Sequence, residues 1–147
     1  MKRIEKDFIG EMEIDDSCYY GIQTLRAIEN FPIDKQKLND FPIFIDSIVI
    51  VKKATALANY ELGLLSFELK EAIIEACDKI LDGGYYSQFV VPMIQGGAGT
   101  STNMNANEVI ANIALEILGH KKGEYQFCHP NDHINKSQST NDVYPTA

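Results

Sequence analysis

The chain has 147 residues, of which 45% are hydrophobic and 23% charged, and it carries a formal net charge of −8 at pH 7. A chain of this length and composition is expected to form a soluble globular domain with a sizeable core. The acidic balance argues against nucleic acid and against an anionic membrane as partners, because like charges repel, but it is compatible with a small anion bound by local donors.

The cysteines and the first residues both indicate a cytoplasmic protein. Cys18, Cys77 and Cys128 are odd in number and widely spaced, which predicts reduced thiols. The opening MKRIEKDFIGEME lacks the apolar stretch of a signal peptide, and no part of the sequence approaches the apolar length of a membrane span. We therefore expect a cytoplasmic localisation and no membrane partner.

The first 30 residues are expected to contain short extended pieces and one helix. Residues 1–17 are charged and irregular, with extended pieces predicted around Phe8–Ile9 and Met12–Ile14. A short helix is predicted over Tyr19–Asn30, because apolar residues recur along it and Pro32 lies beyond its end.

The segment that starts near Pro42 predicts a long helix. Its apolar residues recur at helical spacing, and Ile50 and Val51 widen the stripe, which suggests burial on more than one side. The β-branched run Ile48–Val51 leaves a strand open as an alternative, although the length of the segment favours a helix.

A third helix is predicted after Ser66, which is a good N-cap residue, and Gly83 is expected to end it. The next segment, Tyr85–Ile94, is aromatic and apolar with Pro92 inside it. Because proline cannot donate a backbone hydrogen bond, this segment is expected to be extended or looped.

The stretch GGAGTSTNMNANEVIAN, which starts at Gly96, places glycines and hydroxyl residues at the mouth of a fourth predicted helix. Glycines allow positive φ and close approach to a ligand, and a helix N-terminus attracts anions. An anion site is one interpretation, and a plain turn followed by an N-cap is the other. Asn105 and Glu108 have the spacing of a capping box, with Asn in place of Ser or Thr.

The final stretch, CHPNDHINKSQSTNDVYPTA, has dense hydroxyl and amide side chains and no large apolar residue from Asn135 to Asp142. A ligand site needs such groups more than a core does, because each fixes an oxygen in one direction. A metal site at Cys128, His129, Asp132 and His133 is only weakly indicated, because no second Cys or His pair accompanies it. The glycine stretch is also only a weak match to a phosphate-binding loop, because no Lys follows the glycines as the nucleotide-binding motif requires.

Two long motifs carry a resemblance to a known family. QGGAGTSTNMNANEVIAN (95–112) and HPNDHINKSQSTNDVYPTA (129–147) resemble the first two signature regions of the aspartase/fumarase superfamily. Their wording is closer to the aspartase branch, because GGAGTSTNMN lacks the Gln usual in class II fumarases and SQSTND replaces their common SQSSND. The start of the chain also resembles aspartases, where YYG-x-x-T-x-RA-x-ENF recurs.

The resemblance implies a mainly α fold, the N-terminal helical domain of this superfamily, with short extended segments near the N-terminus. It implies an N-terminal lyase domain at 1–138 and the start of a central helical domain at 139–147. Members are much longer, and the central helical bundle and the loop GSS-x-MP-x-K-x-NP, with its base serine, have no match here. We therefore expect no catalytic base in this chain, no activity from it alone, and a homotetramer for the full-length protein.

The implied reaction is the reversible elimination of ammonia from L-aspartate to give fumarate. Abstraction of a weakly acidic C3 proton forms an enediolate, which preorganised hydrogen-bond donors stabilise. By resemblance, Thr100, Ser139 and Thr140 bind the β-carboxylate, and Asn141 holds the leaving amino group. Ser139 and Asn141 are also good N-cap types, and Pro145 is compatible with the first turn of a helix that begins there.

His129, Asn131 and Asp132 match a second, non-catalytic anion pocket of the fumarase branch. Asp132 is alternatively a cap for the following helix. The resemblance implies no required cofactor and no metal ligands in this chain, with Mg²⁺ as an activator in some aspartases. Two other functions stay open: a class II fumarase acting on malate and fumarate, and a non-catalytic helical binding domain. Exposed apolar helix faces also predict self-association.

Overall fold

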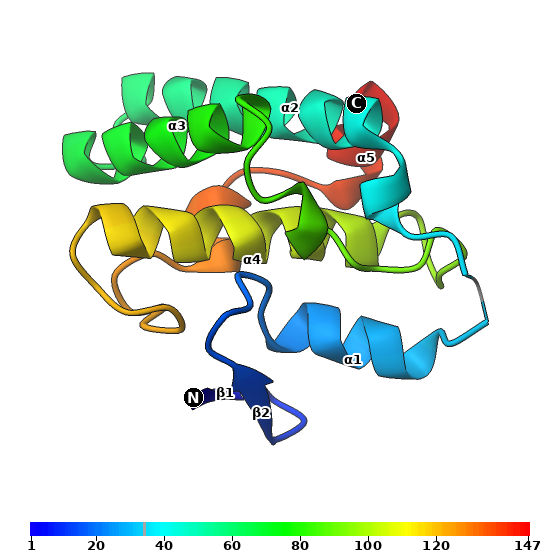
Figure 1. Ribbon diagram of the computed structural model, residues 1–147. Helices are drawn as coiled ribbons and strands as arrows, with labels where there is room; N and C mark the ends of the chain where they lie inside the picture. Colours follow the sequence, from blue (N-terminus) through cyan, green and yellow to red (C-terminus); the bar gives the residue numbers. More distant parts are fainter. Residues whose placement is uncertain (34) are drawn as a thin grey trace.

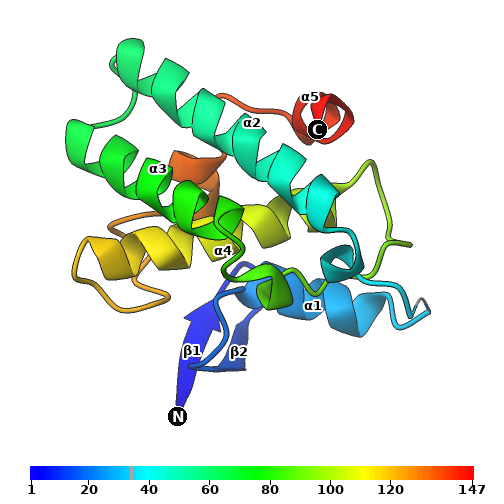
Figure 2. The same ribbon diagram turned by 45° about the horizontal axis from the view of Figure 1, so that its top comes forward.

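The computed structural model describes residues 1–33 and 35–147. Helices α2 and α3 form an antiparallel pair above α4, and α1 and a small two-stranded sheet lie below it (Figure 1). When the molecule is viewed after a rotation about the horizontal axis, α2 and α3 run side by side across α4, and the short α5 lies at one end of α2 (Figure 2). The prediction of a mainly helical fold with short extended pieces near the N-terminus is confirmed.

The sheet pairs β1 (Lys2–Lys6) with β2 (Glu11–Asp15) in antiparallel register, Lys2 opposite Asp15. The extended piece predicted at Met12–Ile14 is therefore confirmed, and the piece predicted at Phe8–Ile9 is wrong. That segment forms the turn, because the Asp7 carboxylate accepts the backbone N–H of Ile9 at 2.9 Å and of Gly10 at 3.1 Å.

Helix α1 (Ile22–Asn30) begins three residues after the predicted start at Tyr19. Gly21 precedes it in an extended conformation, and the backbone N–H of Tyr19 donates to the Gln88 side chain at 2.8 Å. The sequence between Tyr19 and Gly21 is therefore used for contacts with other segments and not for helix.

Helix α2 (Pro42–Glu61) follows a short 3₁₀ turn, η1 (Leu38–Asp40). It begins with proline, which is favourable there because the first N–H groups of a helix have no hydrogen-bond partner within it, so proline's lack of an N–H costs nothing. The helical interpretation of Ile48–Val51 is confirmed over the strand. Helix α3 (Phe67–Leu81) has the predicted N-cap, because Ser66 Oγ accepts the N–H of Leu69 at 3.2 Å.

The segment between α3 and α4 is irregular, as predicted. It contains a single 3₁₀ turn, η2 (Tyr86–Gln88), and an isolated antiparallel bridge between Lys37 and Pro92. The N–H of Leu38 donates to the carbonyl of Val91 at 3.0 Å, which fixes this segment against η1.

Helix α4 (Thr100–Ile117) is the centre of the molecule, and the predicted capping box inside it is wrong. The N-cap is Gly99, in a left-handed conformation, and Asn105 and Glu108 lie fully inside the helix. Asn105 binds a neighbouring segment, accepting the N–H of Val90 at 2.9 Å and donating to the carbonyl of Gln88 at 3.0 Å. Asn105 and Glu108 therefore do not cap a helix, and both side chains bind segments outside α4.

The core lies where α2, α3 and α4 meet. Its buried residues from these helices are Ile45, Ile48, Val49, Ala56, Ala72, Ile73, Ala76, Cys77, Ile80, Ala106, Val109, Ile110, Ala111, Ile113, Ala114 and Leu115. In the described part of the chain, no helix combines the length and apolar character needed to cross a membrane.

The chain ends with a π-helical turn, η3 (Pro130–Ile134), and the seven-residue helix α5 (Thr140–Thr146). Pro145 lies inside α5 beyond its first turn, so the first-turn position that the sequence left open for it is not the one it occupies. The ring of Tyr144 packs edge-on against Phe44 of α2 with centroids 5.4 Å apart. The domain boundary at 138/139 stays a prediction.

Candidate functional site

The two sequence motifs meet along one cavity of about 390 Å³, here called the α5 cavity. Its lining comes from the glycine segment on one side and from α5 on the other: Met93, Gln95, Gly97, Ala98, Gly99, Asn141, Tyr144 and Pro145. Thr100, Ser139 and Thr140 are not among the lining residues and flank them in sequence. The structure thus brings Asn141 to the glycine segment.

Backbone conformation explains why the segment before α4 needs glycines. Gly97 and Gly99 have φ of +77° and +84°, a region that side chains disfavour. A Cβ on Gly99 would lie 2.2 Å from Cδ2 of Tyr144. The predicted close approach of this backbone is therefore an approach to α5, which sits directly on Gly99.

The side chain of Gln95 fixes the start of α4. Its Oε1 accepts the N–H of Thr102 at 2.9 Å, and its Nε2 donates to the Thr102 hydroxyl at 2.8 Å and to the carbonyl of Pro92 at 2.9 Å. Thr102 is buried, and these hydrogen bonds hold the loop against the first turn of α4. Thr100, in contrast, is exposed at the first position of α4.

The first residues of α5 present their polar groups in three different ways. Ser139 is the N-cap, with its Oγ accepting the N–H of Asn141 at 3.2 Å, and both residues are exposed. Thr140 is half-buried, and its Oγ1 accepts from Asn103 Nδ2 at 3.1 Å. A hydroxyl that accepts in this way keeps its own O–H free to donate to a ligand.

The residues predicted for a second anion pocket are only partly together. His129 and Asn131 line a separate cavity of about 440 Å³, together with carboxylates of Asp7 and Glu108. Asp132 does not line it. Asp132 also does not cap η3, because Nδ1 of His129 accepts the N–H groups of Asn131 and Asp132 at 3.1 and 3.2 Å.

The metal interpretation of the final stretch fits its contacts poorly. Nδ1 of His133 accepts the backbone N–H of His129 at 2.8 Å, and burial lowers the pKa of His133. Burial also raises the pKa of the Cys128 thiol to about 12, which opposes the thiolate that a metal needs. Within residues 1–33 and 35–147, no three His, Cys, Asp or Glu side chains are grouped to hold a metal ion.

A cluster of charged residues that sequence reasoning missed fixes the start of α1. Glu108 of α4 is buried and accepts the N–H groups of Gly21, Gln23 and Thr24 at 2.8–3.0 Å, and the Thr24 hydroxyl at 2.6 Å. Burial raises the pKa of Glu108 to about 7.

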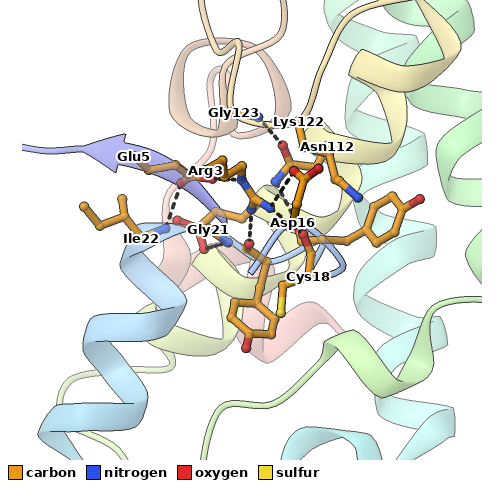
Figure 3. A network of polar contacts seen from close by, with 12 residues as sticks. Arg3, Glu5, Asp16, Cys18, Gly21, Ile22, Asn112, Lys122 and Gly123 are labelled. Carbon is orange, nitrogen blue, oxygen red and sulfur yellow. Dashed lines mark hydrogen bonds and ion pairs between the residues drawn. The ribbon is translucent and has the colours of Figure 1, made fainter. Parts of the chain in front are cut away.

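Strand β1 also contacts the segment that leads into α1, through Arg3 and Glu5 (Figure 3). Arg3 binds Glu5 through Nε at 2.8 Å and donates to the carbonyls of Cys18 and Tyr20. Glu5 in turn accepts the N–H of Ile22 at 2.9 Å. This group, called the α1 cluster (Arg3, Glu5, Thr24 and Glu108), connects β1, α1 and α4.

A second missed cluster surrounds Lys52, which is fully buried in α2. Its Nζ donates to Asn135 Oδ1 and to Gln138 Oε1, both at 2.9 Å. The signal was present in the sequence, because Lys52 continues the helical spacing of the buried residues Ile45, Val49 and Ala56. A lysine at a core position of a helix asks for a polar partner from elsewhere in the chain.

Comparison with known proteins identifies the family to which this chain belongs. A protein-family model described as Lyase matches residues 10–147, and the chain therefore belongs to this lyase family. It is 69% identical over 145 residues to a protein of Helicobacter pylori strain J99 named aspartate ammonia-lyase, and 57% identical over 146 residues to one of that name from Escherichia coli K12. Each match covers 99% of this chain, which spans 31% and 30% of those relatives' lengths.

Solved structures agree with the fold. A Brucella melitensis structure titled fumarate lyase:delta crystallin, bound to cobalt, superposes with a TM-score of 0.97 at 56% identity, covering 99% of this chain and 32% of that one. A recombinant class II fumarase from Schistosoma mansoni superposes with a TM-score of 0.88 at 35% identity, covering 99% and 30%. The N-terminal lyase fold is thereby confirmed.

Proposed function

We propose that this chain forms the N-terminal part of an enzyme that eliminates ammonia from L-aspartate to give fumarate. The meeting of Gly99 and Asn141 along the α5 cavity supports this, because it joins the two motifs into one site. The 57–69% identity to proteins named aspartate ammonia-lyase favours aspartate as the substrate.

In this proposal the chain supplies donors and not the base. The hydroxyls of Thr100, Ser139 and Thr140 donate to the β-carboxylate as negative charge develops on it, and Asn141 holds the leaving amino group. Donors fixed in advance stabilise an enediolate better than the substrate, because the charge on the carboxylate grows along the reaction. Because Thr140 Oγ1 accepts from Asn103, its own O–H is left free to donate in this role.

Further properties follow from the same proposal. Because the chain spans about 31% of the relatives' length, a protein restricted to these 147 residues is expected to be inactive. The complete enzyme is proposed to be a cytoplasmic homotetramer that needs no cofactor, with Mg²⁺ as an activator. The cavity at His129 and Asn131 is proposed as a second, non-catalytic anion site.

The test is a rate assay on the gene product that contains these residues, following fumarate from L-aspartate and separately from L-malate. Aspartate alone is expected to give fumarate. Fumarate from malate would instead make the protein a fumarase, which the superposition with the Schistosoma mansoni enzyme keeps in view. No fumarate from either substrate would favour a non-catalytic binding domain.

Thr140→Val tests the proposed donor. Removal of one preorganised donor is expected to lower kcat/KM for aspartate by about 100-fold or more. Thr146→Val is the matched control in the same helix, because that hydroxyl is exposed and donates to the Asp142 carbonyl of its own helix. Equal effects of the two substitutions would contradict the donor role of Thr140.

A further inference from the structure

Lys52 is buried without an opposite charge beside it. The side chain is fully buried, and the two acceptors of its ammonium group, Asn135 and Gln138, are neutral amides. No carboxylate in the described part of the chain forms an ion pair with it. Burial lowers the pKa of Lys52 to about 7. Moving an ammonium group out of water is unfavourable, and an apolar residue of similar shape at such a position is often equally stabilising or more so.

The two partners of Lys52 lie on either side of a strained turn. Ser137, between Asn135 and Gln138, has a φ of +61°, a left-handed backbone conformation that is unfavourable for a non-glycine residue. Asn135 Nδ2 also donates to the Gln138 carbonyl at 3.1 Å, and Gln138 Nε2 donates to the Ile134 carbonyl at 2.8 Å. The ammonium group therefore holds both ends of a turn that the backbone alone does not favour.

The same turn connects to the proposed donor Thr140 through α4. Asn103 Nδ2 donates to Asn135 Oδ1 at 2.9 Å and to Thr140 Oγ1 at 3.1 Å. Asn107 Nδ2 also donates to Asn135 Oδ1, at 3.3 Å. The Asn135 side-chain oxygen thus accepts hydrogen bonds from Lys52 of α2 and from Asn103 and Asn107 of α4.

Lys52 determines which atom donates and which accepts in each of these hydrogen bonds. An ammonium group can only donate, so Asn135 and Gln138 must present oxygen to it. Asn103 and Asn107 then have to present their NH₂ groups to Asn135, and the same NH₂ group of Asn103 reaches Thr140. Thr140 consequently accepts on this side, and its own O–H is left to donate to a ligand.

Two unpaired oxygens indicate that Lys52 forces this orientation on the asparagine side chains. Asn103 Oδ1 and Asn107 Oδ1 are buried, and neither has a donor among the described residues. Such atoms are rare and costly in folded proteins. A core selected for stability alone would avoid both these oxygens and the buried ammonium, which argues for a role in fixing the site.

We propose that Lys52 is a positioning residue, which fixes the 135–138 turn and, through Asn135 and Asn103, directs the Thr140 hydroxyl toward the substrate. This inference rests on the proposed function of Thr140. Lys52 itself is fully buried and is not among the residues that line the α5 cavity. Asn103, Asn135 and Gln138 complete the path from Lys52 to the site.

The test compares Lys52→Met with Lys53→Met in the gene product that contains these residues. Lys53 is the neighbouring residue on the same helix, with a partly exposed side chain that pairs with Asp78, so it controls for the chemical change. Lys52→Met is expected to lower kcat/KM for aspartate by about 100-fold. It is also expected to speed amide hydrogen exchange in residues 134–141 while leaving α3 unchanged. Lys53→Met is expected to do neither.

A second variant separates positioning from stability. Lys52→Met leaves Gln138 Oε1 without its donor, and adding Gln138→Leu removes that unpaired group. We expect the double variant to regain thermal stability while kcat/KM stays low, because the turn is no longer fixed by charge. Recovery of activity together with stability would overturn the proposal. If Lys52→Met does not fold, Gln138→Leu alone must lower kcat/KM, and normal activity in it would overturn the proposal equally.

Failure of the proposed function would be visible separately. If the unmodified protein forms no fumarate from aspartate, that function is wrong, and hydrogen exchange still decides whether Lys52 orders the turn. Unchanged exchange at 134–141 in a folded Lys52→Met protein would overturn the positioning role, whatever the activity of the unmodified enzyme.

Discussion

Two buried polar clusters attach neighbouring segments to α4, and they differ in charge and in what they hold. In the α1 cluster, the carboxylate of Glu108 accepts backbone N–H groups at the start of α1. In the second, the ammonium of Lys52 donates to the side-chain amides of Asn135 and Gln138. The first cluster ends on backbone, and the second continues through Asn103 to a hydroxyl at the proposed site.

This difference suggests that the α1 cluster mainly stabilises the fold and that the Lys52 cluster mainly supports activity. A carboxylate at a helix N-terminus satisfies donors that would otherwise be buried and unpaired, so its main effect is on stability. A chain of side-chain amides fixes the direction of one hydrogen bond at a site, so its main effect is on activity. Substitutions in the two clusters and at the helix ends therefore differ in whether they change stability or activity.

Glu108→Ala is expected to have the largest effect on stability. It leaves three backbone N–H groups and the Thr24 hydroxyl without their acceptor, which costs at least about 3 kcal/mol. Urea unfolding measures the change, and Glu75→Ala, at an exposed ion pair with Lys79, is the control, expected to change stability by less than about 1 kcal/mol. Similar losses in both variants would contradict the structural role of Glu108.

Gly99→Ala is expected to loosen α5 from α4. The added methyl group meets the Tyr144 ring and also strains a backbone at φ +84°. Gly83→Ala is the control, because Gly83 has a φ of +93° and nothing within 4 Å of an added Cβ. We expect Gly99→Ala to cost about 1–3 kcal/mol more than the control and to reduce activity strongly. Equal losses in urea unfolding would mean that Tyr144 moves away freely.

The pH dependence of stability is expected to distinguish the clusters by sign. The folded pKa of Glu108, about 7, lies above its ordinary value of 4.5, so the stability that it contributes is present below pH 4.5 and lost as pH rises to about 7. The folded pKa of Lys52, also about 7, lies below 10.5, so its contribution rises with pH from about 7 to 10.5.

Unfolding free energies of Glu108→Gln and Lys52→Met, measured against the unmodified protein across pH, test this. Glu108→Gln is expected to remove the downward slope below pH 7, and Lys52→Met the upward slope above pH 7. If both variants change the same pH window, the assignment of one slope to each cluster is wrong.

Ser66→Ala is expected to have the smallest effect. The start of α3 depends on one exposed hydroxyl that accepts one N–H, in contrast to the four hydrogen bonds that Glu108 accepts at α1. Loss of this cap is expected to cost about 1 kcal/mol in urea unfolding and to leave activity unchanged. A loss as large as that of Glu108→Ala would contradict the comparison.

Much of the fold was predictable because helical spacing, caps and proline positions are local signals. The ranges of α2 and α3 and the cap at Ser66 follow from such signals. The errors at Asn105 and Glu108 have one cause, because capping-box spacing also occurs inside a helix and does not reveal tertiary partners. These partners are 15 and 17 residues away for Asn105 and 84 to 87 residues away for Glu108. The start of α1 was predicted three residues early, at Tyr19, because the hydrogen bond from the Tyr19 N–H to Gln88, 69 residues away, is not visible in the sequence.

The site was predictable as a set of residue types and not as an arrangement. The motifs indicated Asn141 and the glycine segment, yet their meeting at the α5 cavity depends on how Tyr144 packs on Gly99. Lys52 gave a visible signal as a charge on an apolar stripe. Its partners, Asn135 and Gln138, are more than 80 residues away, and only the fold identifies them.

The most direct test of the account is a crystal structure of the gene product that contains these residues, grown with L-aspartate or with succinate as an unreactive dicarboxylate. The account predicts one carboxylate within hydrogen-bond distance of the hydroxyls of Thr100 and Thr140, beside Asn141. A dicarboxylate bound only in the cavity lined by His129 and Asn131, or a ligand that does not contact Thr140, would contradict it.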